Sequence, residues 1–186
     1  MSDFKPKLLL HACCAPCAAY VIEKLNKEFD LTVFIYNPNI HPEEEYLKRV
    51  DELIRYCQKY QIDYIEYFYD QENWFKVTRG LENEPEGGKR CEVCFWYRLD
   101  KTANYADSHD YDFFATTLSI SPHKNSKIIN KTGEKLSDEY GVRFLSEDFK
   151  KNEGYKKSCQ LSKRHNFYRQ NYCGCIYSLK ERGLEE

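Results

Sequence analysis

Short apolar runs alternate with amphipathic stretches along most of the chain. Runs rich in apolar and β-branched residues predict strands at residues 7–11, 31–36, 62–68, 111–116 and 142–145. Between them, apolar residues recur at helical spacing and predict helices at residues 15–28, 42–60, 71–80, 91–107 and 125–140. Because strands and helices alternate, we expect an α/β fold with a mainly parallel sheet and helices on both faces, Rossmann-like or nucleotide-hydrolase-like.

The length of 186 residues suits one domain, and no shift in composition marks a second boundary. We expect a single domain over residues 1–186 with a helical C-terminal segment. Hydrophobic residues at 41% and charged residues at 31% are typical of a globular protein. No apolar run approaches the roughly 20 residues that span a bilayer, and the run after Lys7 is too short for a secretory signal. These features predict a cytoplasmic protein with no membrane partner.

Nine cysteines dominate the candidate chemistry of the chain. In a reducing compartment, so many thiols favour metal ligation or redox catalysis over a framework of structural disulfides. Seven of the nine gather in three short motifs, namely His11–Cys17 (HACCAPC), Cys91–Cys94 (CEVC) and Cys173–Cys175 (CGC). Of the other two, Cys57 falls on the apolar face of a predicted helix and is expected in the core. Cys159 has no evident partner.

The first cysteine motif directly follows the first predicted strand. In open parallel sheets, ligands bind outside the carboxyl ends of the strands, which places a ligand site at residues 11–17. The next helix is predicted to begin near Ala15, and the positive potential of a helix N-terminus favours the thiolate form of nearby cysteines. Cys91 and Cys94 lie one helical turn apart, so both can face one point. Together these positions predict a metal centre.

Two kinds of metal centre compete for these thiols. The pairs Cys14/Cys17 and Cys91/Cys94 would satisfy a tetrahedral structural zinc site. An additional thiol at Cys13 has no use in a closed zinc site but suits an iron-sulfur enzyme that keeps a ligand beside an open reactive position. The sequence therefore favours iron-sulfur over zinc and leaves zinc as the alternative.

Cys173 and Cys175 form a separate motif near the end of the chain. Gly174 permits the sharp bend that a disulfide between residues i and i+2 requires, and such a bond would be easily reduced. We interpret the pair as a two-electron redox couple. The alternatives are further metal ligands or ordinary buried thiols.

His11 and His123 are candidates for proton delivery, because both fall in predicted loops at strand ends and histidine titrates near neutral pH. The simpler interpretation is that each serves as a hydrogen-bonding residue.

A net charge of −2 excludes a globally basic surface for nucleic acid, so any such contact must be local. Residues 150–178 form the candidate segment for RNA contact and redox chemistry. Its basic candidates for phosphate contact are Lys156, Lys157, Lys163, Arg164 and Arg169. Nearby aromatic residues, including Tyr155, could stack on an unpaired base. The alternative is a solvated helix face.

Four motifs occur together and in order: residues 11–17 (HACCAPC), 90–95 (RCEVCF), 119–125 (SISPHKN) and 172–178 (YCGCIYS). In this combination the chain resembles the QueH family of epoxyqueuosine reductases over nearly its whole length. The resemblance implies a cobalamin-independent oxidoreductase that converts epoxyqueuosine to queuosine at the wobble position of tRNA. It also implies a tRNA partner and an electron donor whose identity stays open.

The same resemblance implies roles for individual cysteines. Cys13, Cys14, Cys91 and Cys94 correspond to the ligands of a [4Fe-4S] cluster. Cys173 and Cys175 correspond to the redox-active disulfide. The family is also associated with a second iron beside the cluster, for which Cys17 is the candidate ligand.

Two other functions are compatible with parts of the sequence. A zinc-stabilised RNA-binding protein without catalysis would use the CxxC pairs and the basic segment, but it leaves Cys13 and the CGC motif unexplained. An iron-sulfur tRNA thiolase would share the expected fold. Such an enzyme needs a glycine-rich or serine-rich turn after its first strand to bind ATP phosphates, and the turn at residues 13–16 here is Cys-Cys-Ala-Pro.

Overall fold

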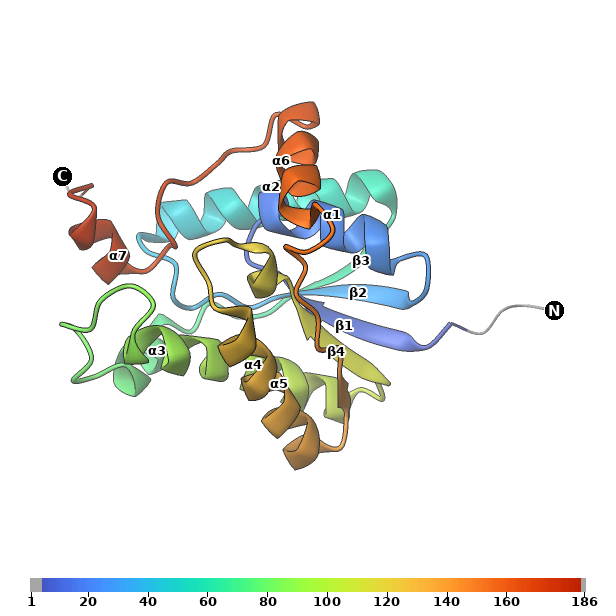
Figure 1. Cartoon of the computed structure of the whole chain (residues 1–186), viewed down its shortest axis with the longest axis horizontal. Helices are drawn as coiled ribbons and strands as arrows, with labels where there is room; N and C mark the ends of the chain where they lie inside the picture. Colours follow the sequence, from blue (N-terminus) through green and yellow to red (C-terminus); the bar gives the residue numbers. More distant parts are fainter. Residues whose placement is uncertain (1–4, 185–186) are drawn as a thin grey trace.

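A central parallel sheet organises the computed structural model, which describes residues 5–184. Its strands are β1 (Lys7–His11), β2 (Asp30–Ile35), β3 (Asp63–Glu66), β4 (Phe113–Thr116) and β5 (Arg143–Phe144). Their order is β3-β2-β1-β4-β5, and every neighbouring pair is parallel. The expected α/β fold with a parallel sheet is confirmed (Figure 1).

Helices cover both faces of this sheet (Figure 1). One face carries α1 (Ala15–Leu25), α2 (Glu43–Tyr60) and α6 (Gly154–Arg164). The other carries α4 (Lys89–Ser108) and α5 (Ser126–Tyr140), with α3 (Gln71–Val77) beside α4. A short 3₁₀ helix, η1 (Thr117–Ile120), follows β4, and α7 (Ile176–Glu181) lies near the C-terminus.

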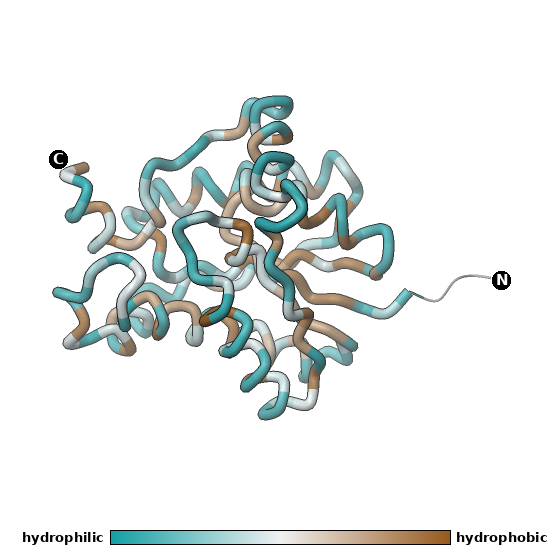
Figure 2. Tube along the Cα trace, viewed as in Figure 1, coloured by the Kyte–Doolittle hydropathy of each residue, from teal (hydrophilic) through white to brown (hydrophobic). Residues whose placement is uncertain are grey.

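The central strand β1 is buried on both sides. Leu8 and Leu10 belong to the core beneath α1 and α2, whereas Leu9 belongs to the core beneath α4 and α5. Apolar residues accordingly line the strands in the interior, and hydrophilic residues lie on the outer helices (Figure 2). Burial on both faces explains why this strand is continuously apolar in the sequence. Cys57 is fully buried in the first of these cores, as expected.

Several elements are shorter than predicted. The strand expected at residues 62–68 ends at Glu66, because its partner β2 ends at Ile35, which is paired with Glu66. The last strand pairs only Arg143 and Phe144 with β4. Helix α1 ends at Leu25 instead of residue 28, with the Asn26 backbone N–H bonded to Ile22 O as the chain turns. Strand and helix ends depend on their partners, which a periodic pattern does not specify.

The C-terminal segment returns to the carboxyl edge of the sheet. Helix α6 packs on α1, where Ser158 Oγ donates a hydrogen bond to Pro16 O at 2.5 Å. From α6 the chain crosses to α7 on the side of the sheet edge where β1 ends (Figure 1). This crossing brings the CGC motif toward the first cysteine loop. In the described part of the chain, no helix combines the length and apolar character needed to cross a membrane.

Candidate active site

Three thiols gather at the carboxyl end of β1. Cys13 and Cys14 lie in the loop after the strand, and Cys17 lies in the first turn of α1. Their sulfur atoms all lie within 4.8 Å of one another, and Cys13 Sγ is 3.7 Å from Cys14 Sγ. Cys14 is the N-cap residue of α1 but its sulfur makes no capping hydrogen bond. All three sulfurs therefore stay available to one metal site, as residues 11–17 predicted.

The surroundings of this thiol triad favour negative charge on Cys13. Hydrogen bonds from Cys14 and Cys17 hold the pKa of Cys13 well below its usual range, and the charges of Lys124 and Arg98 act in the same direction. The same hydrogen bonds with Cys13 raise the pKa of Cys14 to about 12 and also raise that of Cys17. The surroundings thus favour the thiolate form of Cys13, which is the form that binds metals.

Cys91 and Cys94 present a second thiol pair at the start of α4. The Gly87 backbone N–H donates a hydrogen bond to Cys91 Sγ at 3.2 Å. Arg90, 1% exposed, anchors the preceding loop by donating to Leu81 O at 3.2 Å. Both cysteines line a cavity of about 100 Å³. The one-turn spacing therefore turns both side chains to one space, as the sequence predicted.

The CGC motif lies on the same small cavity as Cys91 and Cys94. Cys173 Sγ is 3.5 Å from Cys175 Sγ, and both cysteines are free thiols. The hydrogen bond between the two thiols lowers the pKa of Cys173 to about 6 and raises that of Cys175. Gly174 takes a φ of +117°, a conformation that side chains disfavour. The two thiols are therefore an ionised and a protonated partner in near contact.

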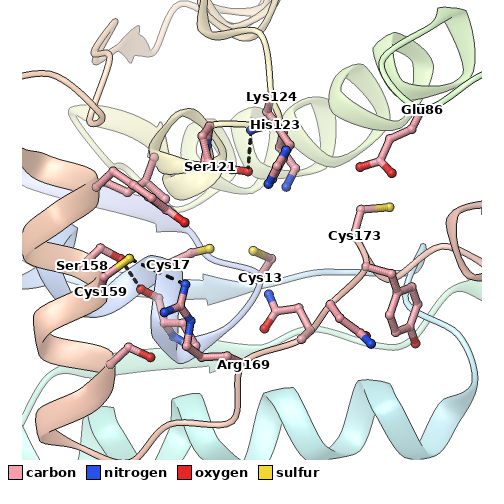
Figure 3. A pocket seen from close by; sticks show the side chains of 18 of the residues that line it. Cys13, Cys17, Glu86, Ser121, His123, Lys124, Ser158, Cys159, Arg169 and Cys173 are labelled. Carbon is pink, nitrogen blue, oxygen red and sulfur yellow. Dashed lines mark hydrogen bonds between the residues drawn. The ribbon is translucent and has the colours of Figure 1, made fainter. Parts of the chain in front are cut away.

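A second, larger cavity adjoins the first. Its volume is about 220 Å³, and Cys13, Cys17 and Cys173 all line it. Figure 3 shows these thiols, with His123 and Lys124 reaching toward them from the segment that follows η1. Four residues line both cavities: Glu86, His123, Lys124 and Cys173. The three cysteine motifs, far apart in the sequence, therefore surround one continuous region.

The two candidate histidines lie in different environments. His11 is fully buried: Nε2 donates to Tyr36 O at 3.1 Å and Nδ1 accepts from the Thr116 hydroxyl at 2.9 Å. Burial, together with the charge of Arg98, lowers the pKa of His11 to about 4. Both nitrogens are occupied and His11 lines neither cavity, so the structure gives it a hydrogen-bonding role and does not support proton delivery. His123 lines both cavities and stays a candidate.

The predicted basic residues do not all line the same cavity. Arg169 lines the larger cavity, where its guanidinium group donates to Cys159 Sγ at 3.6 Å. Lys157 and Arg164 instead line a groove between α6 and α1. Lys156 lines neither of these spaces and forms an ion pair with Glu153 at 2.7 Å on the exposed surface. Four of the predicted basic residues lie on α6 at positions i, i+1, i+7 and i+8, which place them on one side of the helix, whereas Arg169 lies in the segment after α6.

Lys163 is exposed near the end of α6 and lines none of the cavities described here. Arg169 is thus the basic candidate that reaches the thiol-lined region.

Lys124 is a functional candidate that the sequence pattern did not single out. It lines both cavities, and no carboxylate in residues 5–184 forms an ion pair with it. Burial alone would lower its pKa, but the nearby Cys13, Cys17 and Cys173 outweigh that effect and raise it. The signal was its place in the SPHKN motif, in the connection that leaves the carboxyl end of β4 after η1.

Similarity to known structures supports the fold. The chain aligns with the U34-tRNA thiolase NcsA from Methanococcus maripaludis, solved with its [4Fe-4S] cluster, at a TM-score of 0.56 and 13% identity. The alignment covers 94% of this chain and 62% of the thiolase chain. A predicted tRNA methyltransferase subunit from Methanocaldococcus jannaschii aligns at a TM-score of 0.59 and 12% identity, covering 95% and 88%. Identities this low establish a shared architecture alone.

Sequence similarity is far higher to proteins named epoxyqueuosine reductase QueH. The protein from Streptococcus pyogenes serotype M1 is 43% identical over 97% of this chain and 73% of its own length. The protein from Thermotoga maritima is 37% identical over 94% of this chain and 91% of its own length. The family model described as Epoxyqueuosine reductase QueH matches residues 8–181. The chain therefore belongs to the epoxyqueuosine reductase QueH family.

Proposed function

We propose that this chain reduces the epoxide of epoxyqueuosine at the wobble position of tRNA to give queuosine, without cobalamin. The observation that carries the proposal is the convergence of three cysteine motifs on two adjoining cavities. Reduction of an epoxide to an alkene consumes two electrons and two protons and releases the oxygen as water. Thiols that hold a metal centre beside a dithiol couple meet the electron demand of that reaction.

The donor set fits an iron-sulfur centre. The sulfurs of Cys13, Cys14 and Cys17 form the compact group, while Cys91 and Cys94 lie on the adjoining cavity. We assign Cys13, Cys14, Cys91 and Cys94 as ligands of a [4Fe-4S] cluster and Cys17 as a ligand of an adjacent iron. When bound, such a centre supplies single electrons and a Lewis acid for the epoxide oxygen.

Cationic side chains outnumber the carboxylate of Glu86 in the lining of the two cavities. Lys124 and Arg98 line the smaller cavity, and both act on the Cys13 thiolate. A thiolate-ligated centre is anionic, so buried cations beside it offset the free-energy cost of placing it inside the protein. This match of charge is a second reason to place the centre here.

The Cys173–Cys175 pair holds the reducing equivalents in the proposal. Cys173 lines both cavities, and its lowered pKa keeps it as the thiolate at neutral pH. Cys175 packs against Cys94 and Trp74 in a small buried cluster. Oxidation of this thiolate and thiol to a disulfide releases two electrons and one proton, so the two electrons match the demand of one epoxide and the second proton must come from another group or from solvent. A separate donor must then reduce the pair again.

The remaining groups of the larger cavity suit a nucleotide. Arg169 offers a charged donor for a phosphate, and Tyr155, 39% exposed, offers an aromatic ring at the same cavity. His123 is the candidate for proton delivery, because it lines both cavities. These residues support a tRNA nucleotide as the occupant.

Anaerobic reconstitution tests the proposal. The chain is purified without oxygen and incubated with iron and sulfide; metal, acid-labile sulfide and the reduced-state electron paramagnetic resonance spectrum are then measured. We expect about four iron and four sulfide per chain, with extra iron for the adjacent site, and turnover of epoxyqueuosine tRNA without cobalamin or ATP. Stoichiometric zinc without sulfide would overturn the proposal in favour of a zinc-stabilised RNA-binding protein.

A further inference from the structure

Arg49 is a buried cation on the core-facing side of α2. It is 1% exposed, and its Nε donates to Glu45 Oε1 at 2.7 Å. The Glu45 side chain is itself only 11% exposed. Because arginine is almost never fully buried unless it is paired and hydrogen-bonded, its other donors need partners too.

Those partners are backbone carbonyls of the C-terminal segment. Arg49 Nη1 donates to Cys173 O at 3.1 Å, and Nη2 donates to Tyr172 O at 3.4 Å. The guanidinium group also lies 5.2 Å from the centroid of the Tyr172 ring. The planar group thus binds two successive peptide units immediately before Gly174, a geometry that a lysine ammonium cannot reproduce.

Gly174 completes the contact. A Cβ atom at this position would lie 2.9 Å from Arg49 Nη1 and 3.0 Å from Ile40 Cγ1. On the other side, the His41 backbone N–H donates to Gly174 O at 2.7 Å, and the Tyr172 hydroxyl donates to His41 O at 2.6 Å. The CGC backbone is therefore held between α2 and the chain that precedes it.

The charge of Arg49 also acts on the first thiol group. Burial alone would lower its pKa, but Cys14 and Glu45 outweigh that effect and raise it, and the Arg49 charge in turn favours the Cys14 thiolate. One side chain therefore binds the CGC loop directly and acts through its charge on Cys14 in the first cysteine loop.

We propose that Arg49 is a positioning residue for the redox pair: by holding the carbonyls of Tyr172 and Cys173, it keeps the two thiols of the CGC loop where they close readily into a disulfide. The inference rests on the redox role proposed for this pair. Holding the backbone near the bonded arrangement lowers the conformational entropy lost on bond formation, which raises the effective concentration of one thiol at the other.

Equilibrium thiol-disulfide exchange with glutathione tests this role. The sulfurs of Cys173 and Cys175 bond while the disulfide of oxidised glutathione breaks, and the Cys175 thiol proton together with one proton from solvent completes two reduced glutathione molecules. Trypsin cleaves after Arg169 and Lys180 and releases residues 170–180, which contain these two cysteines alone. Alkylation before digestion, followed by mass spectrometry, therefore gives the oxidised fraction of this pair directly.

We expect Arg49→Gln to lower the equilibrium constant for disulfide formation by about tenfold, the scale of one charge-assisted hydrogen bond. Arg49→Lys keeps the charge but lacks the two-pronged geometry, so its equilibrium constant for disulfide formation should also be lower than that of the unchanged chain. Arg55→Gln, on the exposed face of the same helix, is the matched control and should behave as the unchanged chain. Thermal unfolding of each variant verifies that the fold is retained.

Equilibrium constants for both Arg49 variants equal to that of the unchanged chain would overturn the inference. If Arg49→Gln does not fold, Arg49→Lys carries the same test. If the unchanged chain forms no disulfide in residues 170–180 at any glutathione ratio, the redox role of the pair fails, and this inference fails with it. The two failures are thus distinguished by the unchanged chain.

Discussion

The Gln170 side-chain amide donates a hydrogen bond to Cys14 Sγ across 3.2 Å. The two residues lie 156 positions apart in the sequence, so the C-terminal segment touches the first cysteine loop directly. The other atom of the amide, Gln170 Oε1, is buried without a partner, and Gln170 lines the larger cavity. The C-terminal segment therefore lines the candidate active site.

The reactivity of Cys173 should depend on pH in a way that separates it from an ordinary thiol. Its pKa of about 6 lies below the usual value, and the thiolate is the reactive form. Alkylation of residues 170–180 should therefore rise as pH increases through about 6 and level off above it, adding one group per peptide. A rise centred near the ordinary cysteine value of about 8.5 would contradict the assignment.

Lys124 should contribute to that low pKa. Its charge favours the thiolate of Cys173 and of Cys13. Replacing it in Lys124→Gln should move the midpoint of the Cys173 alkylation profile upward by about one pH unit, whereas Lys124→Arg should keep it nearly in place. An unmoved midpoint in Lys124→Gln would show that this charge does not act on the pair.

The redox pair should be separable from the metal centre. Changing both Cys173 and Cys175 to serine should abolish multiple turnover of epoxyqueuosine tRNA and leave the absorbance of the reconstituted cluster intact. The reason is that neither thiol is among the assigned ligands. Loss of cluster absorbance would instead make them ligands, and undiminished turnover would remove them from the reaction.

Much of this arrangement follows from the sequence. The βα alternation predicted the sheet, and the position of residues 11–17 after the first strand predicted a ligand site at the end of that strand, where the structure gathers three thiols. The return of the CGC motif did not follow, because it depends on α6 packing on α1. Arg49 did leave a signal: it falls on the same helical face as Tyr46, Val50 and Leu53, where a charged residue is out of place.

Arg169 should matter more for tRNA than the other basic residues of its segment. It lines the larger cavity, whereas Lys156 is paired with Glu153 on the exposed surface. Arg169→Glu should weaken tRNA binding and reduce the slope of its salt dependence by about one, while Lys156→Glu should have little effect. Fluorescence anisotropy over a range of salt concentrations measures the affinity for tRNA and its salt dependence. Equal effects of the two variants would instead indicate that the basic residues act together as one tRNA-binding patch.

Gly154 should be essential for the placement of α6. A Cβ atom there would lie 1.9 Å from Phe149 O and 2.9 Å from the Tyr20 ring. Because backbone and a packed ring must both move, Gly154→Ala should lower the free energy of unfolding by about 1–3 kcal/mol. Lys156→Ala, exposed on the same helix, is the control. Chemical denaturation compares them, and equal stability would mean that α6 can shift at little cost.

The contact between the C-terminal segment and the first cysteine loop has a consequence for translation. Translation produces Cys13 160 residues before Cys173, an interval of roughly 8–32 s at the usual rates of about 5–20 residues per second. During that time the first three thiols exist without the CGC loop, Gln170 or Arg169 beside them. These three thiols are therefore synthesised, and leave the ribosome, before the residues that will line the candidate site beside them.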